Sequence, residues 1–129
     1  MKRRSKEEIN NDPLTEKIIS ACFNVHKNLG PGFNERIYQN ALKIALDKLP
    51  LKYISEKNFI VEYEGKLVGS FKADMIVEDQ VVVEIKAITG LMPKIFEHQL
   101  LSYLKISGLK VGLLVNFGNE RCQIRRFVY

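Results

Sequence analysis

The chain has 129 residues, of which 46% are hydrophobic and 27% are charged, and its formal net charge is +5. This size and composition predict one ordinary globular domain with a sizeable core, and the net charge favours a polyanionic partner only weakly. No apolar run approaches the roughly 18 residues of a membrane span, and no signal-peptide core is present, so we expect no membrane partner and a cytoplasmic location. Cys22 and Cys122 lack the spacing of a zinc site or a disulfide framework, which predicts buried thiols.

Residues 1–11 are polar and basic, and we expect them to form a flexible tail ahead of a single domain over residues 12–129. The cluster Lys2-Arg3-Arg4 is either a solvated charge run, which is the commoner case, or a contact with phosphates.

Two helices are predicted at the start of the domain. The first has Asp12 as its N-cap, continues to about Asn28 and ends at Gly30-Pro31. His26 lies on this helix, and taken alone such a residue is more often a hydrogen-bonded packing histidine than a ligand.

The second helix is capped by Asn34. Its first residue, Glu35, lies at the head of a stripe that faces the core, which continues through Tyr38, Leu42, Ala45 and Leu49. Glu35 either complements the helix dipole in the first turn, a common role, or belongs to a site, and spacing alone does not separate the two.

The remainder of the chain predicts five strands and one more helix. The expected strands are Tyr53–Val61, Lys66–Val77, Val81–Ile88, Leu109–Phe117 and Arg121–Tyr129, with a helix over Lys94–Ser107. The order α-α-β-β-β-α-β-β predicts an α/β (α+β) fold with a mixed sheet, a crossover helix between two apolar strands, and helices on both faces of the sheet.

The apolar strand Val81–Ile88 contains two opposite charges. Glu84 and Lys86 share one face of this strand with Val82 and Ile88, because side chains alternate with a period of two. Buried charges are costly unless they form a pair or build a site, and we interpret these as a site.

The preceding strand supplies a further acid. If Glu78-Asp79-Gln80 forms a three-residue hairpin loop, Val77 pairs with Val81, and Asp74 then lies opposite Glu84. Two facing carboxylates repel unless a proton or a cation lies between them, and Mg²⁺ or Mn²⁺ with oxygen ligands suits that geometry. Lys86 would lie beside the same cation.

These residues resemble a known group of proteins. Asp74 followed by Glu84-Ile85-Lys86, in this order of elements, resembles the signature of the PD-(D/E)XK nuclease superfamily, with its restriction-endonuclease-like core. The run Gly32-Phe33-Asn34-Glu35-Arg36-Ile37-Tyr38 resembles the motif of the GxxExxY proteins within that superfamily. The run His98-Gln99-Leu100-Leu101-Ser102-Tyr103 also resembles that family, and the likeness covers residues 14–128.

The resemblance implies a role for each matching residue. Asp74 and Glu84 would be direct metal ligands with the Ile85 carbonyl, and Glu35 would hold the metal, often through water. Lys86 would position or activate the attacking water. Further matches imply supporting or substrate-contacting roles for Gln99, Tyr103 and His26. An isolated Gln99/Tyr103 pair is otherwise usually surface or packing.

The resulting hypothesis is a nuclease that uses Mg²⁺ or Mn²⁺ to hydrolyse nucleic acid, DNA more readily than RNA. Lys72 is a candidate phosphate contact, although a solvated strand-edge lysine is the alternative; Arg121, Arg125 and Arg126 could extend a basic surface. Two other interpretations stay open: a non-catalytic nucleic-acid-binding or assembly module, and a structural Glu84–Lys86 ion pair. A homodimer is compatible with this hypothesis, because small nucleases often need two sites for two strands.

Overall fold

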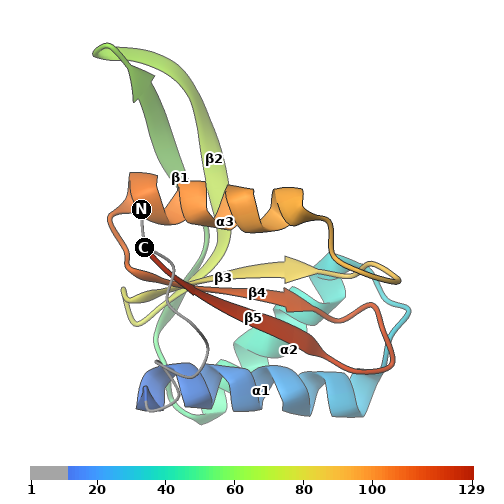
Figure 1. The fold of residues 1–129 in the computed structure, drawn as a ribbon. Coiled ribbons are helices and arrows are strands. Elements are labelled where there is room, and N and C mark those ends of the chain that lie inside the picture. The colour runs from blue at the N-terminus through green and yellow to red at the C-terminus, as the bar shows by residue number, and fades with distance from the viewer. Residues whose placement is uncertain (1–11) are drawn as a thin grey trace.

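The computed structural model describes residues 12–129, so the predicted basic tail of residues 1–11 lies outside the described residues. The described chain follows the predicted order of elements (Figure 1). The elements are α1 (Pro13–Leu29), α2 (Glu35–Lys48), β1 (Tyr53–Tyr63), β2 (Lys66–Val77), β3 (Val81–Lys86), α3 (Lys94–Ser107), β4 (Val111–Asn116) and β5 (Gln123–Val128).

The five strands form one mixed sheet in the order β1-β2-β3-β4-β5. The first three are an antiparallel meander, β3 and β4 are parallel, and β5 is antiparallel to β4. The parallel pair requires a crossover connection, which α3 provides. The predicted mixed sheet is therefore confirmed.

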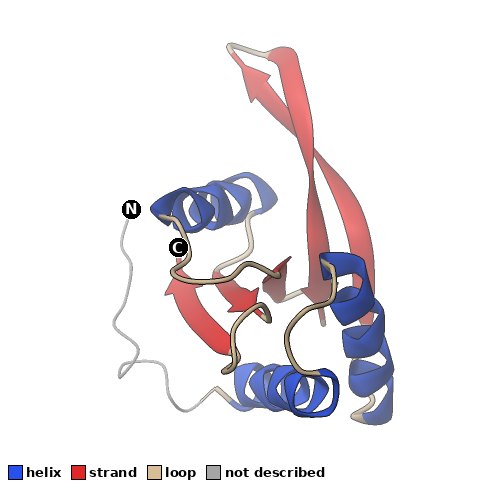
Figure 2. Cartoon of the chain, turned by 90° about the vertical axis from the view of Figure 1, so that its right-hand side faces the viewer, coloured by secondary structure: helices blue, strands red, loops and turns tan. Residues whose placement is uncertain are grey.

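Helices cover both faces of the sheet, as predicted (Figures 1 and 2). On the α1 and α2 side, the buried cluster includes Val81, Val83 and Ile85 of β3, whereas Val82 packs with Leu100 of α3 on the other side. This alternation follows from the two-residue period of a strand that is buried on both faces. None of the described helices combines the length and the apolar character that crossing a lipid bilayer requires.

The strand β3 ends at Lys86, two residues earlier than the sequence predicted. Asn116 explains this end. Its Nδ2 donates to the Ile88 carbonyl at 3.1 Å, and its Oδ1 accepts from the Ile88 amide at 3.0 Å. A fully buried side chain thus satisfies the backbone groups that a continuing strand would have paired, and the chain leaves the sheet.

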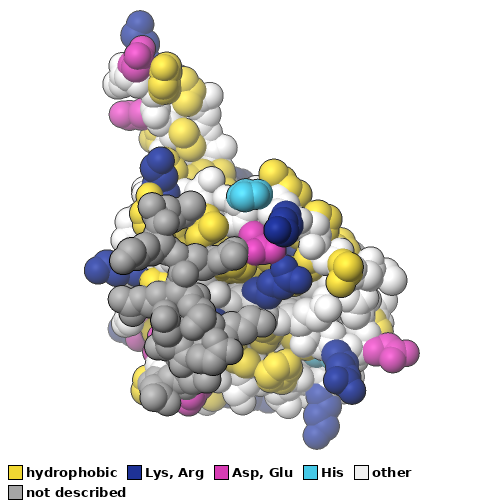
Figure 3. Space-filling view, in the orientation of Figure 1, with side chains coloured by type: hydrophobic (Ala, Val, Ile, Leu, Met, Phe, Trp, Pro, Cys, Tyr) yellow, Lys and Arg dark blue, Asp and Glu magenta, His cyan; other side chains and the backbone are white. Residues whose placement is uncertain are grey.

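The hairpin of β1 and β2 projects beyond α3, and its outer half is exposed (Figures 1 and 3). At its base Phe59 stacks on Phe71 with 5.3 Å between ring centroids, and Phe71 stacks on Tyr103 of α3 at 4.1 Å. These rings connect the hairpin to α3. Exposed apolar side chains on the outer half are Ile60, Tyr63, Leu67 and Val68.

Gly118 provides a test of the Ile88 connection. A methyl group at this position would overlap the backbone of Ile88, which is held in place by two hydrogen bonds with the Asn116 side chain, one donated and one accepted by it. We expect Gly118→Ala to lower the free energy of unfolding by about 1–3 kcal/mol. Urea denaturation measures this change. Gly69→Ala is the matched control, because a methyl group there meets no atom within 4 Å. Equal stability of both variants would contradict the packing described.

Candidate active site

The ladder between β2 and β3 opens at Asp74. The paired residues run from Val77↔Val81 to Met75↔Val83, which confirms the predicted hairpin register. The same register sets Asp74 opposite Glu84, but the two strands are joined there by hydrogen bonds to side-chain carboxylates and not by backbone pairs. The Asp74 amide donates to Glu84 Oε1 at 3.0 Å, and the Ile85 amide donates to Asp74 Oδ2 at 2.8 Å.

A side chain from α2 bonds the remaining backbone polar group of Asp74. Gln39, which is buried, donates from Nε2 to the Asp74 carbonyl at 2.9 Å. Both backbone polar groups of Asp74 are therefore satisfied by side chains, one from β3 and one from α2. Gln39 was not predicted from the sequence, although its position four residues after Glu35, on the same helical face, was an available signal.

The carboxyl groups of Asp74 and Glu84 lie together in a region that is shielded from solvent. Glu84 is only 6% exposed, and burial raises its pKa to about 8, with the neighbouring Asp74 charge adding to the rise. Burial also raises the pKa of Asp74, against the hydrogen bond from the Ile85 amide and the charge of Lys86, which lower it. Such a pair favours a proton or a cation between the groups.

Lys86 lies on the same face of β3 as Glu84. Its Nζ is 4.3 Å from the centroid of the Phe96 ring, a cation–π distance. Its charge lowers the pKa of both carboxyl groups. Over residues 12–129, the ion pairs within 4.0 Å do not include Glu84 with Lys86, so the alternative of a structural ion pair does not describe the arrangement.

The donor set suits a hard divalent cation, because it offers two adjacent carboxylates. The Ile85 carbonyl points to the same side of β3 as its amide, which contacts Asp74.

Glu35 is exposed at the first residue of α2. Within the described part of the chain, no group of three or more His, Cys, Asp or Glu side chains could hold a metal ion. Thus Asp74 and Glu84 come together without Glu35, whose role stays a prediction.

Residues 12–127 match the family model described as PD-(D/E)XK nuclease superfamily. The chain belongs to this superfamily. A crystal structure of SSO0001 is similar to the chain, with a TM-score of 0.59 and 23% identity, and the match covers 88% of this chain. The chain spans 56% of SSO0001, and at this identity the likeness is one of fold. No curated protein matches the sequence. Membership supports the predicted nuclease-like fold, and the narrower GxxExxY likeness stays a resemblance.

In this PD-(D/E)XK chain, Glu56 is a second residue that was not predicted from the sequence. The pairs Ser55↔Met75 and Lys57↔Ala73 place it opposite Asp74, and its charge raises the pKa of Asp74. Its φ of +55° lies in the left-handed region, which costs on the order of 1–3 kcal/mol for such a residue. A glutamate in an exposed strand gives no local signal of this conformation.

The predicted α3 residues differ in their position. Tyr103 is half-buried, and burial raises its pKa, as do the nearby charges of Glu84 and Asp74. Tyr103 therefore lies within electrostatic range of the carboxyl pair. Gln99 is exposed one turn earlier on α3. Lys72 is exposed on β2, opposite Asn58, so the solvated-lysine alternative is compatible with its position.

His26 occupies a packing position. Its Nε2 lies 2.8 Å from the Asn119 carbonyl, and its ring stacks on Phe117 with centroids 6.3 Å apart. Both contacts belong to the end of α1 and the loop after β4, so the packing interpretation describes this residue.

The arginines of β5 do not form the open basic surface that the sequence suggested. Arg125 pairs with Glu97 at 2.7 Å, and Arg126 pairs with the N-cap Asp12 at 2.9 Å. Each guanidinium is thereby engaged with a carboxylate. Arg121 is exposed.

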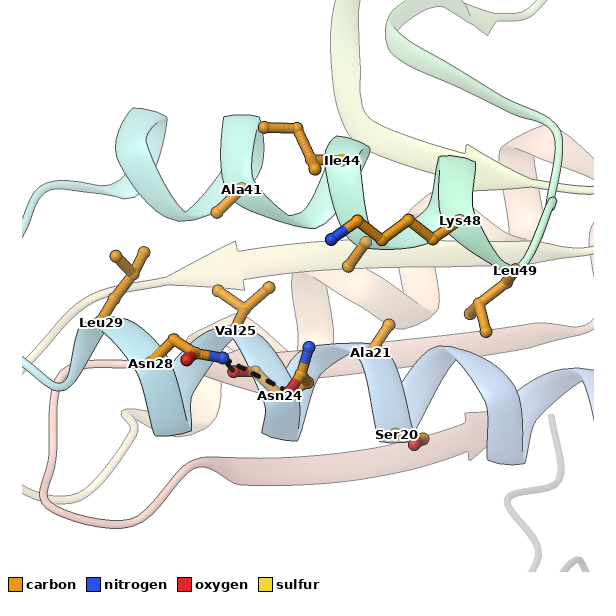
Figure 4. A pocket seen from close by; sticks show the side chains of 11 residues that line it. Ser20, Ala21, Asn24, Val25, Asn28, Leu29, Ala41, Ile44, Lys48 and Leu49 are labelled. Atoms are coloured by element: carbon orange, nitrogen blue, oxygen red, sulfur yellow. Dashed lines mark hydrogen bonds between the residues drawn. The ribbon is translucent and has the colours of Figure 1, made fainter.

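A hollow of about 410 Å³ lies between α1 and α2 (Figure 4). Its lining is largely apolar, with polar contributions that include Asn24, Asn28 and Lys48, and it contains no carboxylate. This hollow therefore lacks the donors that a divalent cation prefers.

The raised pKa of Glu84 predicts a pH-dependent stability of the metal-free protein. The folded state keeps the Glu84 proton up to about pH 8, whereas the unfolded chain loses it near the ordinary value of 4.5. The folded state therefore binds more protons in this window, and stability falls as pH rises from 5 to 8, by at most about 1.4 kcal/mol per pH unit for one proton. Urea denaturation at several pH values measures the slope.

Glu84→Gln is the control, because its amide oxygen can still accept from the Asp74 amide but cannot titrate. We expect this variant to have a flatter profile than the wild type over the same window. Parallel profiles would show that Glu84 is ionised throughout, contrary to the environment described.

Proposed function

We propose that this protein is a divalent-cation-dependent nuclease that hydrolyses phosphodiester bonds of nucleic acid, with DNA as the preferred substrate. The observation that carries the proposal is the interruption of the β2–β3 ladder by the half-buried carboxyl group of Asp74 and the buried one of Glu84, beside Lys86. Superfamily membership supports the same chemistry.

Asp74, Glu84 and the Ile85 carbonyl would hold Mg²⁺ or Mn²⁺ directly, and Glu35 would hold it through water. When bound, the cation supplies Lewis acidity toward the phosphate and lowers the pKa of a coordinated water. Deprotonated carboxylates are needed for binding, and cation binding therefore competes with the proton that Glu84 retains near neutral pH.

Lys86 would stabilise negative charge during hydrolysis. The attacking water forms a bond to phosphorus as the bond to the leaving ester oxygen breaks, and negative charge develops on the non-bridging oxygens. The Lys86 ammonium, held over the Phe96 ring by a cation–π contact, would be a fixed positive charge near those oxygens. Its other task would be to orient the water.

The surroundings favour backbone recognition over sequence recognition. Tyr103 lies within electrostatic range of the carboxyl pair, and Gln99 and Lys72 expose polar groups on α3 and β2. Phosphate contacts position a substrate without reading its sequence. We propose a nuclease without strong sequence preference, and one site in each chain would cut one strand, so a homodimer would suit a duplex.

Cleavage assays test the proposal. We expect the wild type to degrade labelled DNA with Mn²⁺ or Mg²⁺ and not with EDTA, and Glu84→Gln or Lys86→Ala to lower the rate by about a hundredfold or more. Single-stranded, double-stranded and branched DNA, and RNA, are compared by gel electrophoresis. Circular dichroism checks that both variants are folded. Salt-sensitive binding without cleavage would support a non-catalytic module instead.

Cation binding is measured separately by thermal unfolding. We expect Mn²⁺ to raise the midpoint of wild-type unfolding more at pH 8 than at pH 6, because the ligands must lose their protons. Asp74→Asn should abolish the increase. Asp79→Asn, in the exposed β2–β3 turn, is the matched control and should keep it. An increase that is unchanged in Asp74→Asn would place the cation elsewhere.

A further inference from the structure

We propose that the ion pair between Arg36 and Glu56 is a positioning clamp that fixes the first turn of α2, and with it Glu35, against the Asp74–Glu84 pair. The inference rests on the proposed function, because it assigns a role toward the same cation. Neither residue would touch the cation or the substrate.

The clamp joins α2 to β1 at the level of the candidate site. Arg36 Nη1 donates to Glu56 Oε2 at 3.2 Å, and Nη2 donates to Oε1 at 3.4 Å, so both carboxylate oxygens are engaged. The side chains are 60% exposed for Arg36 and 41% exposed for Glu56, so the pair contributes little binding energy, and its effect lies in the orientation that bidentate geometry specifies. Glu56 itself lies opposite Asp74 in the β1–β2 register.

The backbone conformation of Glu56 sets the direction in which its side chain points. Of the four described non-glycine residues with positive φ, the other three, Glu64, Glu78 and Asp79, lie in hairpin turns, whereas Glu56 lies inside β1. A left-handed residue within a strand interrupts the regular alternation and re-aims its side chain. Here the side chain reaches Arg36.

A second contact lies less than one helical turn further along α2. Gln39 donates to the Asp74 carbonyl, three residues after Arg36. The start of α2 is thus attached to β1 by Arg36 and to β2 by Gln39. The buried side chains Tyr38, Leu42 and Leu46 hold the body of α2 against the sheet, and the two attachments add to this by fixing its first turn.

Glu35 is the residue that this fixing of the first turn affects most. It immediately precedes Arg36, and it lies on the same helical face as Gln39, one turn toward the N-terminus. Its side chain is exposed, and within residues 12–129 no hydrogen bond or ion pair holds it. A water-mediated ligand with a free side chain depends on its backbone for placement, and the clamp supplies this.

The test compares Arg36→Gln and Glu56→Gln with wild type. Mn²⁺ affinity, measured by titration calorimetry without nucleic acid, should fall roughly tenfold in each variant, as is typical when outer contacts of a metal site are removed. In cleavage assays kcat should fall with KM unchanged. The exchanged pair Arg36→Glu with Glu56→Arg should regain affinity. Glu62→Gln, an exposed acid on the same strand, is the matched control and should behave as wild type.

A double-mutant cycle identifies Glu35 as the intermediary. If the clamp acts through Glu35, Glu35→Gln combined with Glu56→Gln should bind Mn²⁺ no more weakly than Glu35→Gln alone. Additive losses, or unchanged affinity in the single clamp variants, would overturn the inference while leaving the nuclease proposal intact. A wild-type protein that neither binds Mn²⁺ nor cleaves nucleic acid would overturn both.

Discussion

The contact between Asp74 and Glu84 is the constraint on which the rest of the domain depends. Two carboxyl groups lie against each other inside a sheet, where burial raises the pKa of both. The backbone ladder gives way there, and the groups it would have paired are satisfied by side chains. Unpaired buried charges would be costly, so a site of this kind exists only where the surrounding contacts hold it or a cation compensates it.

The topology brings three layers to this opening. The meander places β2 beside β3, the crossover through α3 adds β4 on the other side, and the two helical layers approach from opposite faces (Figures 1 and 2). Gln39 of α2 donates to the Asp74 carbonyl, and Tyr103 of α3 lies within electrostatic range of the carboxyl pair. The buried network of Asn116 then turns the chain away from the sheet just beyond Lys86. The charged end of β3 is thus framed by rigid elements, which favours precise placement of reacting groups.

The Asp74–Glu84 pair has opposite requirements for the stability of the metal-free protein and for cation binding. A protonated Glu84 suits the folded metal-free protein, whereas a bound cation requires its ionised form. The left-handed backbone of Glu56 is a further local cost at the same level of the sheet. Departures from local preference of this kind are expected where a fold carries a site, and the aromatic stack at the hairpin base and the cores on both faces of the sheet offset them.

The sequence by itself determined the order of elements, the two-faced burial of β3 and the pairing of Val77 with Val81, because periodicity and a three-residue turn are local properties. From these it also placed Asp74 opposite Glu84. Only the tertiary structure decided that Gln39 reaches the Asp74 carbonyl, that Arg36 reaches Glu56, and that Asn116 ends β3 at Lys86. These contacts join residues 20 to 35 positions apart. They depend on how α2 and the loop after β4 pack on the sheet, which no local pattern specifies.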